Sequence, residues 1–229
     1  MNQPSDATTA TLSPQASLAE LATALPGASR VFQRHNLDFC CHGDVSLREA
    51  GNERGLPIEQ LLDELRAEQR AGADFEDWRL RTQDELIEHI LMAFHEPHRT
   101  ELPRLMAMAA KVEQVHADKP SCPRGLAALL AQVHEEMEQH MQKEEQILFP
   151  ALRAGRGRAV LPAIRVMEQE HEDHGANLTR LRALTADYRP PAEACNTWRA
   201  LYLGLQELER DLMQHIHLEN HVLFPRALA

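Results

Sequence analysis

The chain has 229 residues, a formal net charge of −11 and only 4% aromatic residues. The negative charge argues against nucleic acid or an anionic membrane as a partner, because both select clustered lysine and arginine. The apolar residues are mostly Ala, Leu, Val, Ile and Met, which favours helices over strands. We therefore expect an all-α protein.

The cysteines indicate a reducing compartment. There are four, at Cys40, Cys41, Cys122 and Cys195, too few for a disulfide framework in a chain of this length. Adjacent cysteines form a disulfide only with strain, so we expect reduced thiols and a cytoplasmic protein. No apolar run approaches the ~18 residues of a membrane span, and the polar first residues show no signal peptide.

The first third of the chain predicts a disordered start and a small domain. Residues 1–16, rich in Thr, Ser, Ala, Gln and Pro, are expected to be disordered. Residues 17–73 predict a small helical domain, with capping boxes at 17–20 (Ser-Leu-Ala-Glu) and 46–49 (Ser-Leu-Arg-Glu). This domain contains Cys40-Cys41. The pair is either two small residues in a turn or a thiol pair for redox or iron handling, and the sequence favours neither.

Residues 74–229 predict four long helices joined by short loops. A capping box at 82–85 begins the first helix. Apolar residues recur every three or four positions, as one buried helix face requires. The inward faces run through residues 91–112, 126–147, 160–181 and 198–222. Short loops imply an up-down-up-down antiparallel four-helix bundle. Pro97 should bend the first helix.

A motif occurs twice within this expected bundle. The pattern H-x-x-x-E-x-x-x-L-F-P begins at His140 and again at His215. Residues i and i+4 share a helix face, so each copy projects an imidazole beside a carboxylate, Glu144 or Glu219. One such pair would indicate only a chance contact. Two more histidines, His95 and His171, repeat with almost the same spacing on the inward faces of the other two helices.

These repeats predict a dinuclear metal site. An uncompensated buried carboxylate is costly, and two dications would offset two of them. Nitrogen and oxygen ligands from four helices suit a pair of iron or manganese ions. The expected metal ligands are His95, His140, Glu144, His171, His215 and Glu219. If both glutamates bridge and two histidines end each metal, a bridging oxygen and a small exogenous ligand still fit.

Other residues on these faces are weaker candidates for metal ligands. His98 and His174 follow His95 and His171 by three residues. Adding both would crowd the site, so we interpret them as supporting or core histidines. Glu136 lies one turn before His140 and could support the site, although Met137 competes for the inward position.

These residues resemble a known family. The C-terminal portion resembles a hemerythrin-like domain, and segments 116–121, 143–150 and 218–229 are especially similar. Together with residues 37–43 (Leu-Asp-Phe-Cys-Cys-His-Gly), the chain resembles the iron–sulfur cluster repair di-iron proteins, the Repair of Iron Centres family. His42 stands where this family usually has glycine. The resemblance covers nearly the whole chain beyond its start.

The resemblance implies a non-haem di-iron centre, oxo-bridged when oxidised, on the same six residues with both glutamates bridging. It also implies cytoplasmic repair of iron–sulfur clusters under nitrosative or oxidative stress, with iron donation as the leading mechanism. The expected partners are damaged iron–sulfur proteins and nitric oxide or oxygen as small ligands, and a homodimer is allowed. The alternatives are a nitric oxide reductase and a hemerythrin-type carrier or sensor of oxygen or nitric oxide. The cysteine-bearing domain favours repair, because a carrier needs only the bundle.

Overall fold

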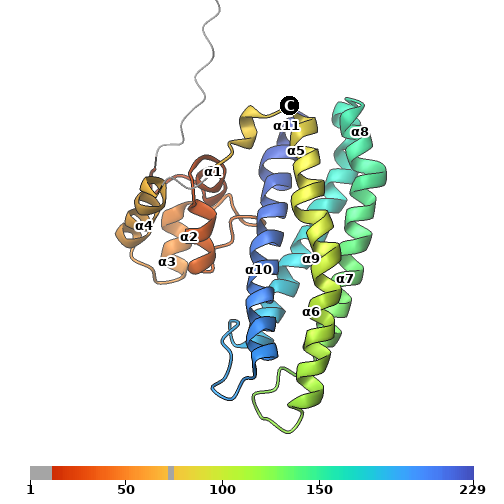
Figure 1. Ribbon diagram of the computed structural model, residues 1–229. Helices are drawn as coiled ribbons and strands as arrows, with labels where there is room; N and C mark the ends of the chain where they lie inside the picture. The colour runs from red at the N-terminus through yellow and green to blue at the C-terminus, as the bar shows by residue number, and fades with distance from the viewer. Residues whose placement is uncertain (1–11, 72–74) are drawn as a thin grey trace, which may run out of the picture. The chain divides into compact units, whose positions relative to one another are not determined.

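The computed structural model describes residues 12–71 and 75–229, and these are helical, as expected. The chain divides into two compact units, Met1–Thr82 and Gln83–Ala229 (Figure 1). Most of the segment expected to be disordered, residues 1–11, lies outside the described residues. Just after it, the carbonyls of Pro14 and Ala16 accept hydrogen bonds from the backbone N–H groups of Arg48 and Leu47.

The N-terminal unit is built from four short helices around a small core. They are α1 (Leu18–Ala24), α2 (Ala28–Arg34), α3 (Leu47–Glu53) and α4 (Ile58–Arg70), and the 3₁₀ turn η1 (Trp78–Leu80) follows. Both expected capping boxes form, at Ser17 and Ser46. Phe32 and Phe39 are fully buried, with ring centroids 6.0 Å apart. The loop that carries the cysteine pair is therefore anchored in this core through Phe39.

The second unit is the expected four-helix bundle. Its four rods are α5–η2–α6, α7–η3–α8, α9 and α10–η5–α11, and a 3₁₀ turn, η4 (Gly157–Val160), precedes α9. The bounds are α5 (Gln83–Ile90), η2 (Leu91–His95), α6 (Glu96–Val115), α7 (Leu126–Lys143), η3 (Glu144–Leu148), α8 (Phe149–Arg153), α9 (Leu161–Thr185), α10 (Asn196–Leu218), η5 (Glu219–Leu223) and α11 (Phe224–Leu228). Helix α6 contacts α7, α7 contacts α9, α9 contacts α10, and α10 contacts α6, which closes the bundle.

Three of the rods are each interrupted by one π-helical turn. These turns are η2, η3 and η5. Each turn ends two residues before a proline: Pro97, Pro150 or Pro225. Proline has no N–H for the usual helical bond. The residue before each proline instead donates to the carbonyl five residues earlier, for example from Glu96 to Leu91. The expected distortion at Pro97 is thus a wider turn, and the same device occurs twice more.

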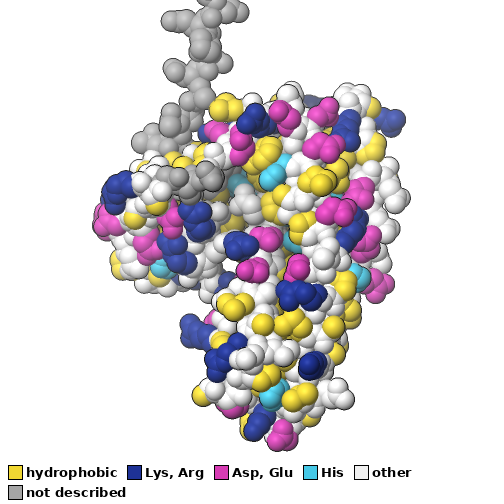
Figure 2. All heavy atoms as spheres, viewed as in Figure 1, with side chains coloured by type: hydrophobic (Ala, Val, Ile, Leu, Met, Phe, Trp, Pro, Cys, Tyr) yellow, Lys and Arg dark blue, Asp and Glu magenta, His cyan; other side chains and the backbone are white. Residues whose placement is uncertain are grey.

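The bundle surface carries mixed charge. In the face shown in Figure 2, acidic and basic side chains are interspersed. Arg99 illustrates this pattern, since it lies between Glu138 and Glu145. Within the part of the chain that the structure describes, no helix has the length and apolar character that crossing a bilayer would require.

Gly204 marks a close approach between α10 and α6. A Cβ atom there would lie 2.6 Å from Cδ2 of Leu105, which is fully buried. Glycine within a helix costs about 1 kcal/mol relative to alanine. Gly204→Val should lower the free energy of unfolding by about 1–3 kcal/mol through overpacking. Leu203→Val, at a side chain that is 62% exposed, is the matched control for denaturant titration. Equal stability of the two variants would contradict the tight contact.

The bundle should fold without the N-terminal unit. All six expected ligands lie within Gln83–Ala229. We expect a fragment of residues 74–229 to keep the helical circular dichroism of this unit and to bind metal in the same ratio as the full chain. An unfolded or metal-free fragment would show that the N-terminal unit belongs to the bundle core.

Candidate metal centre

The structure brings the six expected residues together inside the bundle. All are at most 2% exposed, and they come from all four rods. The six are His95 at the end of η2, His140 in α7, Glu144 at the start of η3, His171 in α9, His215 in α10 and Glu219 at the start of η5. Residues far apart in sequence thus meet at the level where three rods have their π turns.

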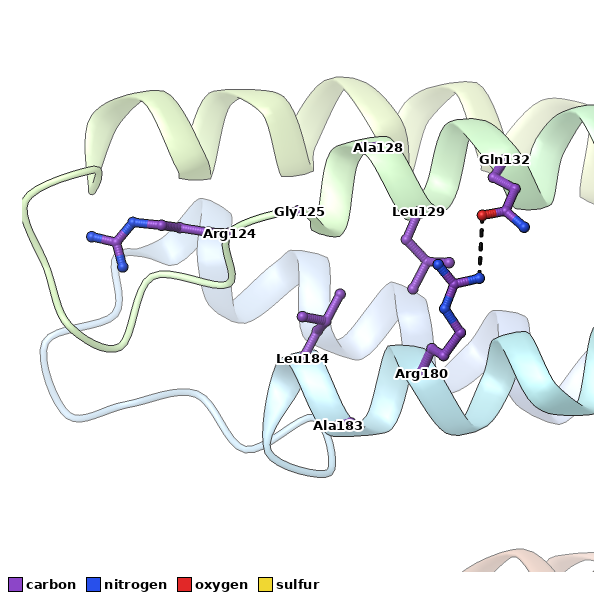
Figure 3. Close-up of a pocket in the computed structure, with 8 residues that line it drawn as sticks. All are labelled: Arg124, Gly125, Ala128, Leu129, Gln132, Arg180, Ala183 and Leu184. Carbon is purple, nitrogen blue, oxygen red and sulfur yellow. Dashed lines mark hydrogen bonds between the residues drawn. The ribbon is translucent and has the colours of Figure 1, made fainter.

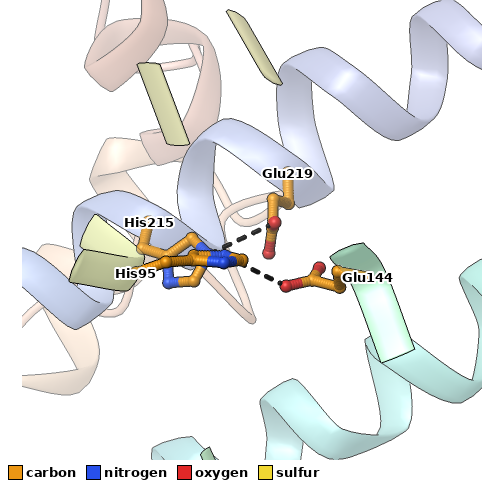
Figure 4. Close-up of side chains that lie close together, drawn as sticks. All are labelled: His95, Glu144, His215 and Glu219. Atoms are coloured by element: carbon orange, nitrogen blue, oxygen red, sulfur yellow. Dashed lines mark hydrogen bonds and ion pairs between the residues drawn. The ribbon is translucent and has the colours of Figure 1, made fainter. Parts of the chain in front are cut away.

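The six residues form two overlapping clusters. The first cluster is His95, Glu144, His215 and Glu219, whose imidazoles and carboxylates face one another in Figure 4. The second cluster contains His140 and His171 with the same two glutamates. In each cluster the potential ligand atoms all lie within 4.8 Å of one another. Two cation positions that share both carboxylates are what bridging glutamates would produce.

The imidazoles present their Nε2 atoms to the centre. Nε2 of His95 lies 3.3 Å from Oε2 of Glu144 and 3.2 Å from Nε2 of His215. In the second cluster, Nε2 of His171 lies 3.1 Å from Oε2 of Glu219 and 3.2 Å from Nε2 of His140. Two imidazole nitrogens this close repel each other unless a proton or a cation lies between them.

The donor set fits a pair of metal ions. All four carboxylate oxygens of Glu144 and Glu219 are buried, and none accepts a hydrogen bond from the residues that the structure describes. Buried polar atoms without partners are rare, because each costs about 1–3 kcal/mol, and more when charged. Two dications would engage these oxygens and the facing Nε2 lone pairs together.

Three of the four histidines are held from outside through Nδ1. The contacts are His95 Nδ1 to Glu145 Oε1 at 2.7 Å, His140 Nδ1 to Glu170 Oε2 at 3.0 Å, and His171 Nδ1 to Asn220 Oδ1 at 2.8 Å. An Nδ1–H that donates outward leaves Nε2 free as a ligand and fixes the ring. Sequence reasoning missed all three partners. Glu145 and Asn220 directly follow Glu144 and Glu219, so the repeat itself carried a signal for two of them.

His215 is the exception. Its Nδ1 is buried without a hydrogen-bond partner among the described residues. The ring of Phe94 stacks on it, with centroids 5.4 Å apart and planes 2° from parallel. Phe94 directly precedes His95, just as Glu170 directly precedes His171. The residue before His171 therefore gives the second cluster a carboxylate, whereas the residue before His95 gives the first cluster an apolar ring.

The different surroundings of His140 and His215 shift the pKa values of these two histidines in opposite directions. Burial alone would lower the pKa of His140, but the charge of Glu144 and the hydrogen bond to Glu170 raise it to about 8. Burial and the neighbouring His95 hold the pKa of His215 well below its ordinary value. Burial would raise the pKa of Glu170, yet His140 and Lys143 lower it to about 2. Glu170 is thus an anion that keeps the His140 imidazole basic, and Glu144 and Glu145 likewise raise the pKa of His95 against the effect of its burial.

The neighbouring histidines stay outside both clusters. His98 and His174 are each 2% exposed, and burial lowers the pKa of both well below the ordinary value. The ring of His174 meets that of His140 edge-on at 5.1 Å. Met137 takes the buried position one turn before His140. Glu136 instead accepts a hydrogen bond from Asn177 at 2.6 Å.

A surface pocket of the bundle is separate from this centre. It lies between α7 and α9, has a volume of about 440 Å³, and contains none of the six residues (Figure 3). Its polar side chains include Arg180, which donates to Gln132 at 3.2 Å. The buried histidines and carboxylates, and not this pocket, hold the groups suited to metal chemistry.

Comparison with known proteins agrees with this geometry. Residues 86–227 match the Hemerythrin HHE cation binding domain, and residues 14–69 match ScdA_N, a domain of unknown function. The iron–sulfur cluster repair protein YtfE of Yersinia pseudotuberculosis serotype O:1b (strain IP 31758) is 50% identical over 212 residues, which cover 93% of this chain and 96% of that protein. The protein of the same name from Yersinia pestis (strain Pestoides F) matches to the same extent.

The two domain matches follow the two compact units, and the cation-binding match spans every residue of both clusters. A sequence identity of 50% over almost the full length of both chains indicates membership of one family and not only a shared fold. The chain therefore belongs to the hemerythrin-like family of iron–sulfur cluster repair proteins that includes these two Yersinia relatives.

Proposed function

We propose that the protein repairs iron–sulfur clusters damaged by nitrosative or oxidative stress, and that it does so by donating iron from the bundle. The observation that carries this proposal is the sharing of both carboxylates between two buried clusters. The two carboxylates offset only two of the four positive charges of a diferrous pair, since imidazole is a neutral ligand. A carboxylate-rich cage would hold ferrous iron more tightly. The name of the Yersinia relatives supports the repair assignment.

In this proposal His95, His140, Glu144, His171, His215 and Glu219 hold two iron ions, and both glutamates bridge them. A bound iron pair would supply redox capacity and exchangeable positions for a small ligand such as nitric oxide or oxygen. The chain's own residues position the ligands. Arg99 contacts Glu145, which orients His95, and Lys143 contacts Glu170, which orients His140. The proposed setting is the cytoplasm, where thiols remain reduced.

Iron transfer is the direct test. The full-length protein is loaded with labelled ferrous iron and mixed with a damaged or apo iron–sulfur protein, and the label and the recovered cluster are followed together. Donation predicts label in the repaired cluster. Recovery without label would mean that iron cycles in place. No recovery would refute repair, and a nitric oxide reductase or a carrier would then be the better description.

Reduced iron should also leave the bundle readily. With only two anionic ligands for two ferrous ions, we expect a ferrous chelator to remove iron within minutes at neutral pH. The rate is measured by the absorbance of the chelate, with oxidised protein as the comparison. Iron that resists the chelator for hours would contradict donation. Exposure to nitric oxide is an independent measurement, because an iron-nitrosyl signal reports an exchangeable position whether or not iron leaves.

A further inference from the structure

A second group of potential metal ligands lies in the N-terminal unit, in the loop after α2. Ligand-type atoms of Asp38, Cys40 and Cys41 all lie within 4.8 Å of one another. The Sγ atoms of the two cysteines are 3.7 Å apart, and Oδ1 of Asp38 is 3.2 Å from Sγ of Cys40. The function proposed for the bundle does not use this group.

The backbone holds these three side chains in place. Oδ1 of Asp38 accepts the backbone N–H groups of Cys40 at 3.1 Å and Cys41 at 3.0 Å. Phe39, between them, is fully buried against the core. Nδ1 of His42 lies 2.7 Å from the other oxygen, Oδ2 of Asp38. The loop therefore holds two thiols and a carboxylate close together before any ligand binds.

The spacing fits a shared metal ion better than a disulfide. Two thiolates on a tetrahedral metal with metal–sulfur bonds of about 2.3 Å lie about 3.8 Å apart. The observed Sγ–Sγ distance is 3.7 Å, far beyond the roughly 2.05 Å of a disulfide bond. The two cysteines are not joined by a disulfide, and Cys41 is partly exposed while Cys40 is buried. An ion could thus reach the pair from the side of Cys41.

The group has the chemistry of a cation site. Two thiols and one carboxylate converge in one loop, and a divalent ion that binds them would release the thiol protons to water. The charge of the ion would then offset the two thiolates beside the Asp38 carboxylate.

We propose that Cys40, Cys41 and Asp38 form a second metal site, which binds one divalent ion that accepts sulfur ligands, Fe²⁺ or Zn²⁺. His42 orients the carboxylate through Oδ2. Three protein ligands leave one tetrahedral position open, which is typical of sites that exchange ligands rather than of closed structural sites. This site is independent of the bundle centre and does not rest on iron donation.

Cobalt is a probe that separates the two sites. Co²⁺ is titrated into full-length, metal-free protein, and near-ultraviolet thiolate-to-cobalt charge transfer is recorded. The bundle clusters contain no sulfur and cannot produce this band. We expect the amplitude of the band at saturation to correspond to a single thiolate-bound Co²⁺ per chain, because Co²⁺ in the bundle does not contribute to it. The band should disappear in Cys41→Ser and require at least about tenfold more free Co²⁺ in Asp38→Asn. The asparagine can still accept both backbone N–H groups, so it removes the charge and keeps the loop.

Cys195→Ser is the matched control, because Cys195 is an exposed thiol at the start of α10. It should leave the band unchanged, and helical circular dichroism verifies the fold of every variant. No band in the wild type would overturn the proposal. A band that survives Cys41→Ser, or one that is lost in Cys195→Ser, would also overturn it.

A second measurement needs no substitution and uses the protein with its bundle metals in place. Zn²⁺ is added, thiols are alkylated, and modification of each cysteine is read by peptide mass spectrometry. We expect Zn²⁺ to slow alkylation of Cys41 by at least about tenfold and to leave Cys195 unaffected as the internal standard. Equal alkylation of Cys41 with and without Zn²⁺ would refute the site even if a variant had failed to fold. Neither result bears on the iron of the bundle.

Discussion

Glu144→Ala should remove both metal ions from the bundle, although it deletes a single side chain. Glu144 belongs to both clusters, so each ion would lose a ligand. One remaining carboxylate, Glu219, would then face two adjacent dications, and their repulsion would be poorly screened in a buried site. Metal per chain after loading with ferrous iron, measured by elemental analysis, is the direct readout. We expect less than half the wild-type content.

Two further variants distinguish ligation from structural damage. Glu144→Gln keeps the shape and removes the charge, so it should lose metal as alanine does while keeping the helical circular dichroism. Glu136→Ala is the matched control, because Glu136 lies on α7 near the centre but binds Asn177 and belongs to neither cluster. It should keep both ions. Retention of one ion in Glu144→Ala would mean that Glu144 binds only one position, and retention of both would remove it from the ligand set.

Glu170→Ala should weaken metal binding at the second cluster by about 10–100-fold, the usual cost of losing a carboxylate that supports a metal-bound histidine. Glu170 accepts the Nδ1 hydrogen bond of His140 at 3.0 Å and keeps that imidazole basic. His215 in the first cluster has no such acceptor among the described residues. In the wild type, the ion beside His215 should therefore be the first to leave.

Competition with a graded series of chelators gives the two macroscopic dissociation constants. We expect two well-separated dissociation constants in the wild type. The two constants should lie closer together in Glu170→Ala, because this variant weakens the tighter site. Phe94→Leu is the matched control, since Phe94 holds the equivalent position and offers no hydrogen-bond acceptor. It should leave the constant of the tighter site, beside His140, unchanged. The same shift in both variants would show that packing, and not the carboxylate, sets the affinity.

The sequence predicts the bundle and the six buried residues for a simple reason. His140 and Glu144, like His215 and Glu219, are four residues apart, and the interval between them lies within regular α-helix. Helical periodicity therefore predicts that each pair lies on one buried face, as the structure shows, and the repeat distinguishes these pairs from chance. The segment from Cys40 to Cys41 has no comparable regularity, so only the loop hydrogen bonds of Asp38 show how its side chains are arranged.

The outer partners of the histidines could not be predicted in the same way. Glu145 follows Glu144 directly, and a regular α-helix turns consecutive side chains to different faces. Here a π turn begins at Glu144, and its wider winding lets both residues serve the centre. Glu170 has a different cause, because it reaches His140 across the gap between α9 and α7. Such a contact depends on how two helices pack, which no single-helix pattern encodes.

The three π turns also bear on how an ion could leave a fully buried centre. Among the described residues, η2, η3 and η5 are the π turns of the bundle, and each carries a proposed ligand at its first or last residue. Such turns replace regular helical bonds and are followed by prolines that donate none. Local opening therefore costs less there than in the α-helices on either side. Under the iron-donation proposal, release of an ion requires only one of these π turns to open while the rest of the bundle stays folded.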